Sequence, residues 1–329
     1  MPGMTTRATA ALATAALMSG LLLTGASAAT AAPREPCTAN CQSRLSLPGG
    51  GQLPYHATYP LTGATEARGA VVVVHGTGRN AQGYFDGMVK AAGTLIERTA
   101  IIAPHFQTAD DNPPQQDARW TNSGTGSWKD GGNAVRPTGL SSFTAVDHIL
   151  RTLADKSRFP NLTKVTVAGH SAGGQFVQRY AAGSPAPAEL TGLEITYVTA
   201  NPSSYLYLNS QRPALGSCPG YDNYKYGLKQ RNPYMSRPSA DQIRARYSSR
   251  RVTYLLGERD TLRDSSLDTE CPAEAQGRNR FERGNAYFDS VTGQFPGLPH
   301  RLVTVPGIGH DGTAMFGSSQ GRSAVFNGR

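Results

Sequence analysis

Charged residues and cysteines are scarce in this sequence. Charged side chains make up only 17% of its 329 residues and hydrophobic ones 38%. With no repeat or low-complexity tract beyond the N-terminal segment, this composition excludes a disordered chain and indicates a globular one. The four cysteines form no cluster with histidine at the spacing of metal ligands, which argues against a zinc module. The length suits one large α/β domain, and two smaller domains are compatible with it.

Long runs of basic residues are also missing. The formal net charge is +9, but lysine and arginine are scattered, with short clusters only at 244–251 and 278–283. Nucleic-acid-binding domains concentrate such residues on one face or helix, so we expect a solvated basic surface and no nucleic-acid partner. Attraction to acidic polymers or cell-wall surfaces is compatible with this charge and would be sensitive to salt.

Residues 1–31 have the pattern of a signal peptide. Arg7 precedes a largely apolar stretch over 8–23, and small residues at 26–28 and 29–31 offer cleavage sites. The apolar stretch contains threonine, serine and glycine and has no charged stop-transfer flank, so a membrane anchor is the less favoured interpretation. We therefore expect a secreted protein without a stable membrane anchor, whose single catalytic domain spans 32–329.

Export makes disulfide bonds the expected state of the cysteines. Four cysteines permit three pairings. We expect Cys37 to pair with Cys41, closing a small N-terminal loop, and Cys218 to pair with Cys271. The second bond would tie a long insertion to the loop that carries a candidate catalytic acid.

Apolar runs alternate with helical patterns along most of the chain. Position 71 begins a run of four valines, as expected of a strand buried on both faces of a parallel sheet, and residues 143–153 show helical spacing after two serines that can cap a helix. Alternating strands and helices predict a mostly parallel sheet with helices on both faces. The runs taken as strands are 71–74, 100–103, 165–168, 195–200, 252–256 and 302–305.

Two long segments interrupt this alternation. Residues 107–139 are rich in Asp, Pro, Gly and Asn and contain both tryptophans, and residues 201–250 hold seven of the fourteen tyrosines. Loops of this length in a compact domain usually serve function. We expect both to wall a substrate cleft, with 201–250 as a lid-like insertion.

The pentapeptide at 169–173, Gly-His-Ser-Ala-Gly, is the motif that indicates catalysis. It has G-x-S-x-G spacing, follows an expected strand and precedes a helical stretch, as a nucleophile elbow does. Only small residues fit two positions either side of a serine held on such a sharp turn. Ser171 is the candidate nucleophile.

Partners for this serine follow the last two expected strands. His310, on a glycine-rich loop, is the candidate base, and Asp260 is the candidate acid that orients it. Glu258 and Asp264 remain alternatives for the acid. The order Ser, Asp, His differs from that of chymotrypsin-like and subtilisin-like enzymes.

Further residues are expected around this trio. The backbone amides of Ala172 and Thr77 are candidates for the oxyanion hole, with Gly78 as an alternative to Thr77. An aromatic pocket for the acyl or alcohol group is one interpretation of the remaining residues, and ordinary packing is the other. The candidate pocket residues are His75, His105, Trp120, Trp128, His170 and Tyr205.

Together, the His-Gly turn at 75–76, the elbow at 169–173, Asp260 and His310 resemble the α/β-hydrolase superfamily, especially exported bacterial serine esterases. The resemblance covers roughly residues 45–325. It implies an α/β-hydrolase fold and an acyl-enzyme mechanism that uses no metal or organic cofactor. We expect a carboxylic ester substrate, small or polymer-linked, with aryl or feruloyl esters as one example. A secreted serine peptidase and a non-catalytic binding protein on a hydrolase scaffold are the alternatives.

Overall fold

The computed structural model describes residues 1–6, 8–9, 35–63 and 65–327 of the chain. It divides into two units, Met1–Ala32 and Pro33–Arg329. The expected signal peptide, residues 1–31, lies mostly outside the described residues. Within the described residues, no helix is long and apolar enough to cross a membrane.

One sheet organises the second unit. Within residues 35–63 and 65–327, eight strands pair in the order β1-β2-β4-β3-β5-β6-β7-β8. β1 and β2 join the edge antiparallel, whereas the other six strands run parallel. The strands are β1 (Gln42–Ser46), β2 (Gln52–Ala57), β3 (Gly69–Val74), β4 (Thr99–Pro104), β5 (Lys164–His170), β6 (Glu194–Ala200), β7 (Arg251–Gly257) and β8 (His300–Val305).

All six predicted strands are confirmed, each apolar run lying inside one parallel strand. The two antiparallel strands were not predicted. β1 is short and mostly exposed, and β2 contains Pro54, which sequence reasoning treats as a strand breaker except at edges. His56 lies in β2 opposite Ala103 of β4.

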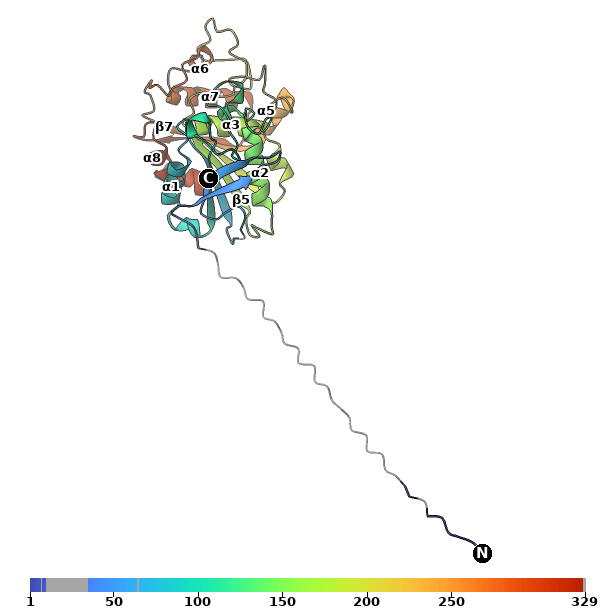
Figure 1. Ribbon diagram of the computed structural model, residues 1–329. Helices are drawn as coiled ribbons and strands as arrows, with labels where there is room; N and C mark the ends of the chain where they lie inside the picture. Colours follow the sequence, from blue (N-terminus) through green and yellow to red (C-terminus); the bar gives the residue numbers. More distant parts are fainter. Residues whose placement is uncertain (7, 10–34, 64, 328–329) are drawn as a thin grey trace. The chain divides into compact units, whose positions relative to one another are not determined.

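Helices cover both faces of the sheet (Figure 1). One buried cluster joins the sheet to α1 and α8, and a larger one joins it to α2, α3, α5 and α7. Short helices complete the set. The helices are α1 (Ala81–Ala92), η1 (Gly93–Glu97), η2 (Ala109–Asp111), η3 (Gly124–Gly126), η4 (Trp128–Asp130), α2 (Ser142–Ala154), α3 (Ala172–Gly183), α4 (Ala186–Glu189), α5 (Ala240–Ser249), α6 (Cys271–Glu274), α7 (Arg280–Gln294), α8 (Gly312–Gly317), α9 (Ser319–Arg322) and η5 (Ser323–Asn327).

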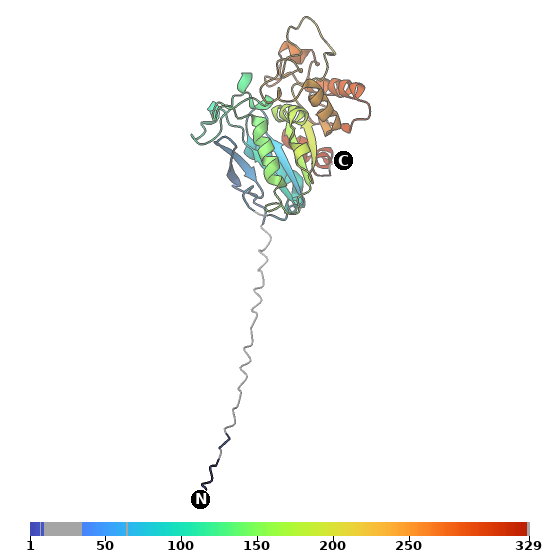
Figure 2. The same cartoon turned by 90° about the vertical axis from the view of Figure 1, so that its right-hand side faces the viewer.

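The two long segments lie beyond the carboxyl ends of the parallel strands, because they follow β4 and β6 (Figure 2). The first contains only the short helices η2 to η4. In the second, residues 201–239 have no regular element, but 240–249 form α5. This helix buries Ile243 and Tyr247 in the core against the sheet, so the irregular insertion ends at residue 239 and not at residue 250 as expected.

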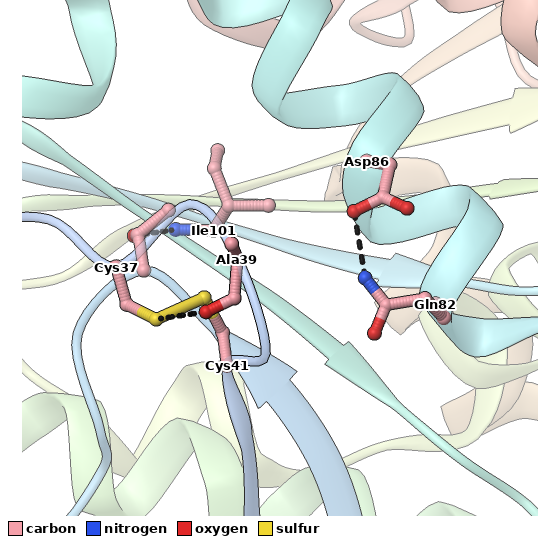
Figure 3. Close-up of a disulfide and its surroundings, with 7 residues drawn as sticks. Cys37, Ala39, Cys41, Gln82, Asp86 and Ile101 are labelled. Atoms are coloured by element: carbon pink, nitrogen blue, oxygen red, sulfur yellow. Dashed lines mark hydrogen bonds between the residues drawn. A yellow bond between two sulfur atoms is a disulfide. The ribbon is translucent and has the colours of Figure 1, made fainter.

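Both disulfides join the expected partners. Cys37 and Cys41 close a small loop next to β1, near the start of α1 (Figure 3). Cys218 bonds to Cys271 across 53 residues of chain, which ties the 201–239 insertion to the loop after β7. The described residues contain no other cysteine.

Candidate active site

Ser171 occupies the turn between β5 and α3 with a strained backbone. Its φ of 59° and ψ of −121° lie in a region that residues with a side chain rarely adopt. A side chain at Gly169 would collide with the backbone of Gly173, and one at Gly173 would collide with the carbonyl of Val74 on the neighbouring strand. The two glycines therefore permit the close packing that holds the serine at the tip of the turn.

His310 and Asp260 meet Ser171 from two other loops. The Ser171 hydroxyl lies 2.9 Å from His310 Nε2, within hydrogen-bond distance. On the other side of the ring, His310 Nδ1–H donates to Asp260 Oδ2 over 2.6 Å. Asp260 is buried and its hydrogen bond fixes the tautomer that leaves Nε2 free to accept a proton.

The alternative acids lie elsewhere. Glu258 accepts a hydrogen bond from the backbone of Gly307, and Asp264 binds the guanidinium of Arg280 through both carboxylate oxygens, at 3.0 Å each. Hydrogen bonds from Arg280 hold the pKa of Asp264 well below its usual range. Among these three acids, only Asp260 contacts His310.

Two backbone amides next to Ser171 are available to an oxyanion. Ala172 begins α3, so its N–H has no acceptor within the helix, and Thr77 follows β3 in the loop that faces the elbow. Among the described residues, neither amide has a hydrogen-bond acceptor. Thr77 and Ser171 line the same cavity of 360 Å³, together with His170 and His310.

His75 supports the loop after β3 that contains Thr77. The side chain is fully buried, its Nδ1–H donates to the carbonyl of Gly76 over 2.9 Å, and its Nε2 accepts from the Phe106 N–H over 3.0 Å. Burial lowers the pKa of His75 to about 3, so the ring is neutral at neutral pH. His75 thus supports the loop that precedes Thr77 and does not line the cavity.

His170 and Tyr84 form the wall beside Ser171. The Tyr84 hydroxyl lies 3.0 Å from His170 Nδ1, and the His170 ring packs 4.6 Å from that of His310. Burial, and secondarily the neighbouring His310, lowers the pKa of His170 well below its ordinary value. A neutral His170 places no second positive charge beside an imidazolium on His310.

The expected aromatic pocket is not where sequence reasoning placed it. Trp120, Trp128 and Tyr205 are completely buried in the core, and among the six candidate pocket residues only His170 lines the cavity at Ser171. Trp128 stacks parallel to Phe106 and packs 4.6 Å from His75. The tryptophans pack here because the irregular segment after β4 has few other large apolar side chains to cover the sheet.

Sequence reasoning did not select Tyr84, Ser266 or Arg280, although the first two line the cavity and the third contacts Asp260. Tyr84 lies on α1, and no local motif marks it. Arg280 belongs to the basic cluster at 278–283, which the sequence alone presents as a solvated surface. Five acids within the preceding 20 residues were the available signal for a buried cation.

Comparison with known proteins gives matches only among solved structures. No family model and no curated protein sequence matches the chain. LpqC, a poly(3-hydroxybutyrate) depolymerase from Bordetella parapertussis, is 26% identical over 88% of this chain and 90% of its own, with a TM-score of 0.62. Poly(aspartic acid) hydrolase-1 from Sphingomonas sp. KT-1 shares the fold at 23% identity, over 87% of this chain and 98% of its own, also with a TM-score of 0.62.

Proposed function

We propose that this chain, a carboxylic ester hydrolase with the α/β-hydrolase fold, is an exported enzyme whose nucleophile is Ser171. The observation that carries the assignment is the continuous chain of contacts from Ser171 Oγ through His310 to Asp260, at 2.9 and 2.6 Å. A serine, a base and an orienting carboxylate in this relation supply what nucleophilic acyl transfer requires.

The first half of the reaction forms an acyl-enzyme. His310 Nε2 takes the proton of Ser171 as Oγ attacks the ester carbonyl, and the negative charge of Asp260 stabilises the resulting imidazolium. The carbonyl oxygen becomes negative and accepts hydrogen bonds from the amides of Ala172 and Thr77. His310 then gives its proton to the leaving alcohol, and the acyl group stays on Ser171.

The second half consumes water. His310 takes a proton from a water molecule, which attacks the acyl carbon, and the same two amides stabilise the oxyanion. Collapse of this intermediate returns the proton to Ser171 Oγ and releases the carboxylic acid. Every proton transfer passes through one imidazole, which explains why a neutral His170 beside it matters.

The proposed substrate is a carboxylic ester that is linked to a polymer. LpqC is described as a depolymerase of a polyester, and this supports a polymer-linked ester for the present chain. The tryptophans and tyrosine that suggested an aryl or feruloyl group lie in the core, so the aromatic acyl group loses that support. We therefore place the specificity in the alcohol or polymer side of the ester.

Export has two lines of support. The sequence of residues 1–31 has the composition of a signal peptide, and the two disulfides suit an oxidising compartment. These bonds also fix the N-terminal loop and the 201–239 insertion.

Rates on p-nitrophenyl esters and on peptide anilides test this function. We expect ester cleavage by the native protein and none by Ser171→Ala with an unchanged circular dichroism spectrum. Strong amidase activity with negligible esterase activity would favour a peptidase instead. A protein inactive on both and unreactive toward fluorophosphonate would be a binding protein on a hydrolase scaffold.

A further inference from the structure

A second and larger cavity lies between the two long segments. It has a volume of 630 Å³ and is lined by residues 122–130 of the first segment, residues 224–233 of the second, and Glu270. Glu270 precedes Cys271, so the Cys218–Cys271 disulfide ties one wall of this cavity to the loop after β7. No residue of this cavity belongs to the cavity at Ser171.

Two contacts place this cavity close to the nucleophile. On α3, the Arg179 guanidinium lies 3.2 Å from Gln175 Oε1 and 3.1 Å from Asp130, which lines the cavity. Arg179 is eight residues beyond Ser171, a rise of about 12 Å along α3. The wall of the cavity at Asp130 is therefore about two helical turns along α3 from the nucleophile, a length that one extended substrate spans.

The second contact involves the loop after β3, which contains the candidate oxyanion-hole residue Thr77. Ser127 and Lys129 line the cavity and flank Trp128, whose ring packs 4.6 Å from that of His75. His75 in turn holds the carbonyl of Gly76, next to Thr77. The cavity and the candidate oxyanion hole are thus connected through the packed rings of Trp128 and His75.

Most of the residues that line the cavity are polar or charged. Apart from Gly124 and Pro233, every residue that lines it has a side chain that can form hydrogen bonds. Tyr224 and Tyr226 add aromatic rings, and their hydroxyls donate to the Asp130 carbonyl and to Glu270, each over 2.5 Å. No Ala, Val, Leu, Ile or Met side chain is among the residues that line it.

Two polar groups in the lining lack partners among the described residues. The Ser127 hydroxyl is buried with no hydrogen-bond partner, an arrangement that costs stability unless a ligand or solvent pairs with it. The ammonium of Lys129 forms no ion pair, although nearby Lys225 pairs with Asp268 at 3.2 Å. Burial lowers the pKa of Lys129.

We propose that this cavity binds sugar units of a saccharide whose ester is cleaved at Ser171. Amides, hydroxyls, a free ammonium and aromatic rings in one cavity match a ligand with many hydroxyl groups and apolar ring faces. Lys129 and Ser127 hydrogen-bond the sugar hydroxyls and hold the ester toward the nucleophile. This inference rests on the proposed function and names the part of the substrate that the cavity recognises.

Binding measured on Ser171→Ala tests the inference without any turnover. Xylotetraose, tetragalacturonate and a linear 3-hydroxybutyrate tetramer are titrated separately by isothermal calorimetry. We expect saturable binding of at least one of the two saccharides, weakened about tenfold by Lys129→Met in the same background. Lys90→Met, the same change at an exposed position of α1, is the matched control and leaves binding unchanged. Equal melting temperatures show that the variants are folded.

Two results would overturn the saccharide site. One is binding of the hydroxybutyrate tetramer alone, or of none of the three probes. The other is saccharide binding that neither Lys129→Met nor Ser127→Ala weakens. Ester cleavage by the wild-type protein decides the proposed function separately, so either hypothesis can fail while the other stands.

Discussion

Arg280 Nη1 lies 3.5 Å from Asp260 Oδ1, and both side chains are completely buried. The same guanidinium binds Asp264 and the hydroxyl of Ser266, which lines the cavity at Ser171. The carboxylate that accepts a hydrogen bond from His310 is thus also paired with a cation at the start of α7. This relation joins the loop after β7, the helix and the active site into one charged network.

Removal of this buried cation should destabilise the protein strongly. Arg280→Met leaves the carboxylate of Asp260 in the core without its cation, and we expect the free energy of unfolding to fall by about 3–5 kcal/mol. Urea denaturation measures this value. Arg278→Met, at an exposed position on the same segment, should leave stability unchanged. Equal stability of the two variants would show that the network contributes little.

Substitution of the orienting acid should act on turnover. Asp260→Asn keeps the shape of the side chain but favours the wrong tautomer of His310, so kcat should fall by about three to four orders of magnitude. Glu258→Gln, two residues away and exposed, is the control and should retain nearly full activity. Near-normal turnover of Asp260→Asn would remove Asp260 from the mechanism.

The backbone of Ser171 should store strain that glycine relieves. At a φ of 59° and ψ of −121°, alanine has the same steric conflict as serine, whereas glycine has none. Ser171→Gly should therefore unfold with a free energy about 1 kcal/mol higher than Ser171→Ala. Both variants lack the nucleophile, so chemical denaturation compares them on equal terms. A more stable alanine variant would contradict the strained turn.

Acid should destabilise the protein through its buried histidines. Burial lowers the pKa of His300 to about 4, below the ordinary value of 6.5, so the unfolded state binds more protons between these pH values. The stabilisation is complete above pH 6.5 and is lost as pH falls toward 4, at up to about 1.4 kcal/mol per pH unit. His75 and His170, also with lowered pKa values, act in the same direction.

Replacement of His300 isolates its contribution to the pH dependence of the free energy of unfolding. His300→Gln removes one proton-binding group, so the slope of unfolding free energy against pH should decrease between pH 4 and 6.5. His300 lies at the start of β8, away from Ser171, and activity at neutral pH serves as the control. Urea denaturation at three pH values gives the slope. An unchanged slope would mean that His300 is protonated in the folded state.

Local sequence patterns predicted the strands and turns that position the candidate site. A valine run followed by His-Gly, and G-x-S-x-G between an apolar run and a helix, are local signals whose physical cause lies within a few residues. The six parallel strands could be placed for the same reason, because a strand buried on both faces is continuously apolar. His310 and Asp260 could be selected since loops after parallel strands meet at one edge.

Features that depend on distant packing could not be read from the sequence. Trp120 and Trp128 lie in a polar, irregular segment, which suggested the wall of a substrate pocket with ordinary packing as the alternative, and three-dimensional packing places them in the core. Arg280 lies in a basic cluster and is buried only because Asp260 and Asp264 reach it from another loop. Strand β2, which lies between β1 and β4, contains a proline and is recognisable only once these pairings are known.

The central claim is that Ser171, activated by His310, is the nucleophile that carries the acyl group in the acyl-enzyme. Mapping of the adduct by peptide mass spectrometry after treatment with a fluorophosphonate tests it most directly. The account predicts a single modification on the peptide containing Ser171, and strongly slowed labelling in His310→Ala. Modification of another residue, or ester cleavage that continues in fully labelled protein, would contradict it.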